Sequence, residues 1–209
     1  DIASLAKLSG KDMPVSGTLN TRVALHGSME NPIGNGNLSV TNALAYNEPI
    51  NSVQIKFGGT GDQAHATLAV SLPAGSINSD VTVNPKLKTY TARLTSTGIT
   101  IQKLESVKAK NLDATGTVAI NASGQGSFDN PQLTASIQIP SLSIHNQQVA
   151  DIKLDAAVAN HVANAPLTSA AMHTSIDAKA RVNLTGDYET DATLDTKNIP
   201  LQPIVAVYS

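Results

Sequence analysis

The sequence contains no cysteine and no tryptophan, and aromatic residues make up only 3% of its 209 positions. Without cysteine the chain forms no disulfide and no thiolate metal site, which fits a reducing cytosol or an envelope protein that avoids thiols. Charged residues reach only 14%, and the net charge of -2 offers no basic surface for nucleic acid. There is no signal-peptide pattern and no apolar run near the roughly 20 residues of a membrane span. The 41% hydrophobic content is instead mostly Ala, Val, Leu and Ile.

An internal repeat is the most informative feature that the sequence does contain. The hexamer GSMENP begins at Gly27, and GSFDNP begins at Gly126, which is 99 positions later (126 − 27 = 99). The match extends on both sides, and one inserted residue changes the spacing to 100 near the end of each copy. Repeated units in proteins stack on their neighbours. We therefore expect two repeats, 1–102 and 103–209, that share one continuous sheet.

Regular alternation of apolar and polar residues predicts strands throughout the chain. In VSGTLNTRVALHG, the apolar residues Val15, Leu19, Val23 and Leu25 alternate with polar ones, which is typical of a half-buried strand. Similar runs recur along the chain, separated by short connections rich in Gly, Pro, Asn and Asp, so we expect about a dozen antiparallel strands. The two hexamers predict a turn between the first and second strands of each repeat. Helical spacing is confined to short segments at 1–9, 101–110 and 201–209, which indicate short helical junctions.

A long sheet of this composition has one aliphatic face and no helices to cover it. Monomers rarely expose a contiguous apolar patch larger than roughly 300 to 600 Å². The sheet must therefore close into a sandwich, roll into a barrel, or curl into a trough that something else fills. Periodicity does not distinguish these three solutions. The repetition favours the trough, because a sheet that grows by adding units has no natural point of closure, and we expect an elongated, curled antiparallel sheet.

Residues with catalytic chemistry do not form a recognisable motif. No pair of the five histidines has the spacing of HExxH, and thiols are absent. GNGN at 34–37 precedes a predicted strand, so no helix N-terminus follows it to bind phosphate. A Ser-rich chain contains the letters of a Ser-His-Asp triad, but no spacing favours one. We therefore expect no enzymatic activity and no metal or cofactor. The histidines are His26, His65, His145, His161 and His173.

Three stretches together resemble a known family over essentially the whole chain. They are VSGTLN…HGSMENPIGNGNLSV…EPINSVQIKF, its echo ATGTVAINASGQGSFDNPQLTASIQI, and LDTKNIPLQPIVAVY. This pattern resembles the repeats of the TamB proteins, translocation and assembly module subunits related to the AsmA-like family. The resemblance implies a taco-shaped sheet in an inner-membrane-anchored envelope protein, which crosses the periplasm and carries phospholipid between the two membranes.

The family's N-terminal anchor and the C-terminal segment that meets an outer-membrane barrel protein have no counterpart in this sequence. We therefore expect a segment of a longer chain, whose partners are phospholipid acyl chains and adjacent repeats. Any contact with a barrel protein would use regions absent here. The alternative is a structural or adhesive repeat of a surface protein with a closed, dry core. The expected lining residues of a lipid groove are Leu38, Val40, Ile55, Leu68, Val70, Val81, Val118, Ile120, Ile137, Ile139, Ile152, Leu154, Ile176 and Val182.

Overall fold

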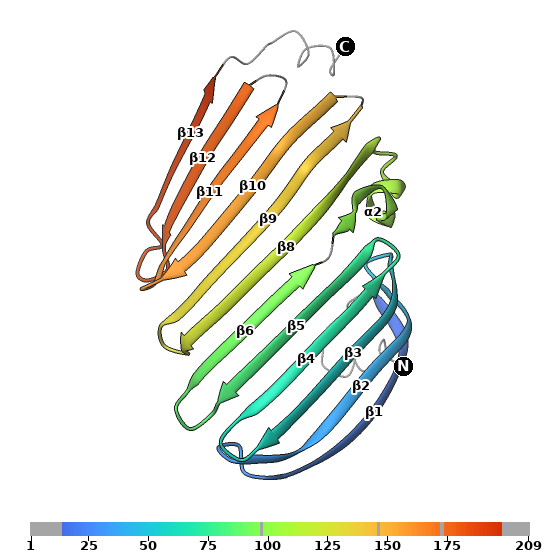
Figure 1. Cartoon of the computed structure of the whole chain (residues 1–209), viewed down its shortest axis with the longest axis vertical. Helices are drawn as coiled ribbons and strands as arrows, with labels where there is room; N and C mark the ends of the chain where they lie inside the picture. Colours follow the sequence, from blue (N-terminus) through green and yellow to red (C-terminus); the bar gives the residue numbers. More distant parts are fainter. Residues whose placement is uncertain (1–13, 97, 146, 172–173, 198–209) are drawn as a thin grey trace.

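The computed structural model describes residues 14–96, 98–145, 147–171 and 174–197 (Figure 1). Nearly all of these residues belong to strands, and the helical residues are confined to one short connection. The elements in chain order are β1 (Val15–Gly27), β2 (Pro32–Ala45), β3 (Glu48–Thr60), β4 (Ala64–Leu72), β5 (Gly75–Asn84), β6 (Thr89–Ser96), β7 (Ile99–Thr100), η1 (Ile101–Lys103), α2 (Glu105–Ala109), β8 (Ala114–Ser127), β9 (Pro131–Ile144), β10 (Gln147–Ala159), β11 (Val162–Ala171), β12 (Thr174–Asn183) and β13 (Thr190–Lys197).

The strands form one large antiparallel sheet of 13 strands, and their order in space follows their order in the chain. Only the short β7 lies off this path, where it pairs with β8. Within the described residues β1 and β13 each pair on one side only, so the sheet is not closed into a barrel. Figure 1 shows the long strands side by side, with β1 and β2 strongly bent. The predicted fold, an all-β curled antiparallel sheet, is confirmed.

The strand boundaries repeat with the same spacing as the sequence. β2 and β9 are 99 positions apart at their first residues, and β3 and β10 are 99 positions apart at theirs (131 − 32 = 99; 147 − 48 = 99). Hydrogen bonding continues from β6 to β8, so the sheet runs without a break from the first six-stranded unit into the second. The boundary that we placed at residue 102 falls within the connection between them.

The repeated hexamers form equivalent turns, as predicted. Between β1 and β2, the backbone N–H of Asn31 donates to the Oγ of Ser28 at 3.1 Å. Between β8 and β9, the N–H of Asn130 donates to the Oγ of Ser127 at the same distance of 3.1 Å. The glycine before each serine has a positive φ, and a Cβ on Gly27 would lie only 2.3 Å from the carbonyl oxygen of Asn31. The recurring Gly-Ser…Asn-Pro pattern is thus explained by turn geometry.

The connection between β6 and β8 contains the predicted helical segment at 101–110, as η1 and α2. The Glu48 carboxylate at the start of β3 accepts hydrogen bonds from the backbone N–H groups of Glu105, at 3.2 Å, and Ser106, at 3.3 Å. A side chain of the first repeat therefore caps the N-terminus of α2. The other two segments for which we predicted helix, 1–9 and 201–209, lie outside the described residues. Among the described helices, none combines the length and apolarity needed to cross a membrane.

The buried core is small and lies beside this connection. In the described part of the chain the buried hydrophobic residues are Ala74, Ile99 and Ala114, and the buried polar residue is Ser96. The N–H of Thr100 donates to the carbonyl oxygen of Ala74 at 2.8 Å, which ties β7 to the turn between β4 and β5. The rest of the sheet is covered by no described element. Its aliphatic side chains therefore need a separate explanation.

Candidate functional site

One face of the sheet, which we call the aliphatic face, carries rows of directly opposed apolar residues. In an antiparallel ladder, directly opposed residues point to the same face and their Cβ atoms lie about 4.5–5.5 Å apart. The register traces one row across every strand from β1 to β13 except β7, and all its members but the last are apolar or glycine. The row consists of Val23, Gly36, Phe57, Ala66, Val81, Ala92, Gly124, Leu133, Val158, Ala163, Val182 and Thr190.

Neighbouring rows place most of the expected lining residues on this same face. Thirteen of the fourteen lie on this face by register and strand alternation. Val81 and Val182 belong to the long row itself, and the other eleven belong to two neighbouring rows in the first repeat and three in the second. Their role as a lipid lining stays a prediction. The rows are Leu38–Ile55–Leu68, Val40–Val53–Val70–Ile77, Ile120–Ile137–Leu154–Leu167–Ala178–Leu194, Ile139–Ile152 and Ser169–Ile176.

The fourteenth residue, Val118, has a different environment. The β8–β9 register shifts between Gly116 and Ala119, and Val118 lies at this bulge, opposite Ile99 of β7. It is therefore next to the small core rather than in the middle of the open rows. A bulge inserts one extra residue and breaks strict alternation, so periodicity alone does not locate it.

Small residues on the aliphatic face were missed as lining candidates. Ala92, Ala122, Ala135 and Ala156 belong to rows that cross the middle of the sheet. The same alternation that selected the Leu, Ile and Val positions also marks these alanines. Their small side chains continue the apolar surface between the bulkier Leu, Ile and Val side chains.

The aliphatic face does not form a dry interior. All fourteen predicted lining residues are half-buried, and none of them belongs to the small buried core. Exposure rises toward the edges of the sheet, to 51% for Val23 in β1 and 68% for Leu194 in β13. A closed sandwich would bury these side chains. The described sheet instead leaves an aliphatic surface open to solvent or to an apolar ligand.

Alanine shows that the two faces are shielded differently, because its side chain has the same size everywhere. Ala92 and Ala122 on the aliphatic face are half-buried, whereas Ala69 and Ala157 on the opposite face are exposed. Side chains therefore shield one another more on the aliphatic face than on the polar face.

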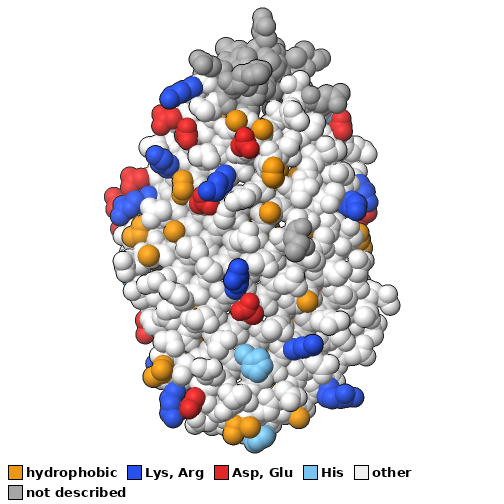
Figure 2. Space-filling view, viewed as in Figure 1, with side chains coloured by type: hydrophobic (Ala, Val, Ile, Leu, Met, Phe, Trp, Pro, Cys, Tyr) orange, Lys and Arg blue, Asp and Glu red, His pale blue; other side chains and the backbone are white. Residues whose placement is uncertain are grey.

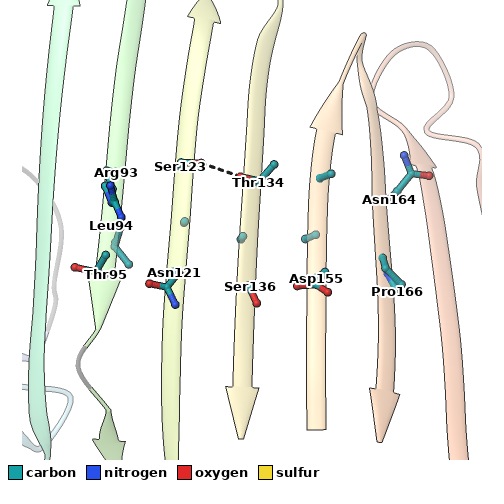
Figure 3. Close-up of a pocket in the computed structure, with 14 residues that line it drawn as sticks. Arg93, Leu94, Thr95, Asn121, Ser123, Thr134, Ser136, Asp155, Asn164 and Pro166 are labelled. Atoms are coloured by element: carbon teal, nitrogen blue, oxygen red, sulfur yellow. Dashed lines mark hydrogen bonds between the residues drawn. The ribbon is translucent and has the colours of Figure 1, made fainter. Parts of the chain in front are cut away.

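The opposite face, the polar face, carries mainly neutral polar side chains with scattered charges. Figure 2 shows few hydrophobic side chains on the side facing the viewer. A shallow hollow of about 740 Å³ lies there over β6, β8, β9, β10 and β11. Figure 3 shows its polar side chains, including Ser123 and Thr134, whose hydroxyl oxygens are 2.8 Å apart. Asp155 also lines the hollow, and a hydrogen bond from Lys153, with a second from Ser136, lowers the pKa of its carboxyl.

Groups suited to catalysis or metal binding are dispersed on the described surface. His26, His65, His145 and His161 are exposed, and His173 lies outside the described residues. Within the described residues no three His, Asp or Glu side chains gather in a way that could hold a metal ion. The continuous aliphatic face is therefore the candidate functional site.

The chain matches no protein-family model, no curated protein and no solved structure. Interpretation of the site therefore rests on its geometry and chemistry. The aliphatic face is mostly apolar, and its polar members are isolated hydroxyl groups such as those of Ser79 and Ser169. A surface of this kind is suited to flexible apolar chains, which it would hold mainly through buried area.

Proposed function

We propose that this chain is a segment of a lipid conduit, in which the aliphatic face holds phospholipid acyl chains as they cross an aqueous compartment. The observation that carries the proposal is the row of apolar residues and glycines from β1 to β12, whose apolar side chains remain half-buried or exposed. A soluble protein seldom leaves such a surface open unless it binds something apolar. The chain acts by binding and guiding lipid and has no catalytic step.

The energetics favour such a surface as a lipid carrier. A diacyl lipid has roughly 30 methylene groups, and each contributes about 0.8 kcal/mol when it leaves water. Free passage of a lipid through water is therefore opposed by on the order of 20 kcal/mol. An aliphatic trough removes a large part of this barrier. Because its rows are mostly Ala, Val, Leu and Ile and carry no charged group, an acyl chain can move along it without breaking ionic contacts.

The cellular setting of the proposal comes from the resemblance to TamB-like repeats. We infer a periplasmic segment of an inner-membrane-anchored protein that supports outer-membrane assembly by supplying phospholipid. The absence of cysteine is compatible with that compartment.

Site-specific photo-crosslinking tests the proposal. A benzophenone amino acid replaces Ile55 or Ile137 on the aliphatic face, and Gln54 or Gln138 at the adjacent exposed positions serve as matched controls. Cells with two membranes are irradiated, and the purified protein is analysed by mass spectrometry for attached phospholipid. We expect lipid adducts at Ile55 and Ile137 and none at the two glutamines.

Two outcomes would contradict the conduit. One is the absence of adducts at Ile55 and Ile137 in a protein whose circular dichroism shows the native sheet. The other is equal labelling on both faces, which indicates nonspecific contact with membranes. A structural or adhesive repeat predicts the first outcome, because its aliphatic face would contact protein rather than lipid.

A further inference from the structure

Within the described residues, the two edges of the sheet are exposed over matching lengths. Every residue of β13 is exposed, and residues 20–27 of β1 are exposed as well. Among the described strands, β1 and β13 each have a hydrogen-bonded neighbour on one side only. Unpaired edges are templates for pairing with another strand, and proteins often protect them with prolines, charged side chains, bulges or short lengths. Neither β1 nor β13 contains a proline, and the register shift in β1, between Ser16 and Thr18, lies outside residues 20–27. The charged residues at these edges are Arg22 in β1 and Asp191, Asp195 and Lys197 in β13.

The pairing of β6 with β8 inside the chain is a template for pairing between β13 and β1. Leu194 in β13 pairs with Ala178, just as Leu94 in β6 pairs with Ser79, which is 99 positions before Ala178. β13 is therefore the counterpart of β6. By the same comparison β1 is the counterpart of β8. Val23 pairs with Gly36, and the residues 99 positions after them, Ala122 and Ala135, pair with each other. Inside the chain, β6 and β8 pair directly, with Leu94 opposite Ala122.

We propose that β13 of one copy pairs antiparallel with β1 of a second copy, in the register that β6 and β8 use within the chain. Transferring the internal register places Leu194 of one copy opposite Val23 of the other. It also places Ala192 opposite Leu25 and Thr193 opposite Ala24. The inference does not depend on lipid binding, since it rests on the repeat and on the edges alone.

Apolar burial supports this register. Leu194 is 68% exposed, whereas its counterpart Leu94 is half-buried beside β8. Val23 and Leu25 are 51% and 48% exposed at the other edge. Pairing in the proposed register joins these side chains on the same face and continues the rows of the aliphatic face into the second copy.

Charge supports the same register independently. It places Asp195 of β13 opposite Arg22 of β1. Asp195 lies directly opposite Asp177 of β12, and like charges in such a cross-strand pair repel each other. Arg22 from a second copy would supply the positive charge between them. A shift of one residue would instead place Asp195 opposite Val23 on the wrong face of the sheet.

The interface is heterologous, because each copy contributes a different edge. Association of this kind leaves one β1 edge and one β13 edge free after each addition, so it continues into an open, growing sheet. The internal junction has an additional stack of Tyr90 on Phe128, with ring centroids 6.0 Å apart. Thr190 and Met29 occupy the corresponding positions at the edges. The contact between copies is therefore weaker than the internal junction and reversible.

Cysteine cross-linking tests the register in the purified, delipidated chain, which has no cysteine of its own. The variant Leu194→Cys with Val23→Cys places the two thiols at directly opposed positions, within the roughly 3.5–4.5 Å Cβ separation of a disulfide once the strands adjust. We expect oxidation to give a ladder of disulfide-linked oligomers. Leu194→Cys with Leu25→Cys, displaced by two residues, is the out-of-register control and should give at least about five-fold less product, since diagonal positions lie about 7–8 Å apart.

The internal pair Leu94→Cys with Ala122→Cys is the positive control and should form a disulfide within the monomer. If this control forms and the Leu194→Cys, Val23→Cys variant stays reduced, the proposal is overturned. Equal yields from the in-register and displaced variants would overturn the register. A monomeric disulfide between positions 23 and 194 would overturn the second copy as the occupant, because it would show that the two edges of one chain meet.

A charge exchange between copies gives a separate test. Arg22→Asp and Asp195→Arg each create a like-charge contact in the proposed interface, so each variant alone should associate about three- to ten-fold more weakly in sedimentation. In a mixture, each contact between the two different variants has opposite charges again, so the variants should associate with each other about as well as the unmodified chain does. Failure of the mixture to recover, or full association of either variant alone, would contradict the proposed pairing.

Discussion

Isoleucine side chains have different environments in two regions of the molecule. At the junction, Ile99 is only 8% exposed and lies with Ala74 and Ala114 in the small core. In the middle of the second repeat, Ile137 is half-buried on the aliphatic face, where no described element covers it. The comparison shows that the hydrophobic residues serve two purposes. A few hold the repeats together, and many more form a surface that the fold itself does not close.

The largest expected effect is on the junction. Ile99→Ala removes a buried side chain and leaves a cavity, so we expect the free energy of unfolding to fall by about 2–4 kcal/mol. Ile137→Ala, the matched change on the aliphatic face, should cost less than half as much, since Ile137 is already partly hydrated. Urea unfolding followed by circular dichroism measures both. Equal losses would mean that the two isoleucines lie in the same kind of environment.

A charge on the aliphatic face gives the next largest effect. In Ile137→Asp the carboxylate stays in contact with water on an open face, so we expect a native sheet with a loss of about 1–2 kcal/mol. Under the proposed function, the same variant should retain less phospholipid than the unmodified chain, because a charge interrupts the apolar row. Circular dichroism and lipid extraction provide the two measurements. The paired control, Gln138→Asp, should change neither. Unfolding of Ile137→Asp would instead indicate a closed core.

The hydrogen bonds from α2 to the Glu48 carboxylate test how strongly the junction between the repeats is held. Glu48→Ala removes the acceptor for the N–H groups of Glu105 and Ser106, and we expect a loss of about 1 kcal/mol. Faster hydrogen exchange in α2 should accompany it. Asp62→Ala is a suitable control, since that carboxylate makes only an exposed contact of 3.8 Å with Lys86. An unchanged exchange rate in α2 would show that Glu48 does not hold the junction.

The smallest expected effect is the titration of Asp155 on the polar face. Its hydrogen bond with Lys153, at 2.9 Å, and a second with Ser136 lower its pKa below the ordinary value of 3.8. The contribution to stability is therefore complete above pH 3.8 and is lost as the pH falls through the lower folded pKa.

Carboxyl NMR measures this titration. Lys153→Ala should raise the midpoint of Asp155 toward 3.8, whereas the distant substitution Lys56→Ala should leave it in place. An unchanged midpoint in Lys153→Ala would show that the lysine is hydrated and does not interact with the carboxylate. The result also tests whether the pKa of a carboxyl on the polar face depends only on its immediate neighbours.

The strands and turns were predictable because their signals are local. Alternation across Ile137 and Ile139 assigns both residues to one face, and the Gly-Ser…Asn-Pro hexamers specify turns through glycine φ angles and a serine acceptor. The position of Val118 was harder to predict from local signals. Its environment depends on the bulge in β8 and on its pairing with Ile99, which lies 19 positions earlier in the chain (118 − 99 = 19).

The sequence by itself determined the two repeats, the antiparallel order and the division of side chains between two faces, because periodicity and turn chemistry act over a few residues. Only the tertiary structure decided that the described sheet stays open. Closure depends on whether distant strands such as β1 and β13 meet, and that is set by the accumulated twist and curvature of the whole sheet. No local sequence pattern encodes this accumulated twist and curvature. Because the sheet stays open, its aliphatic face remains accessible.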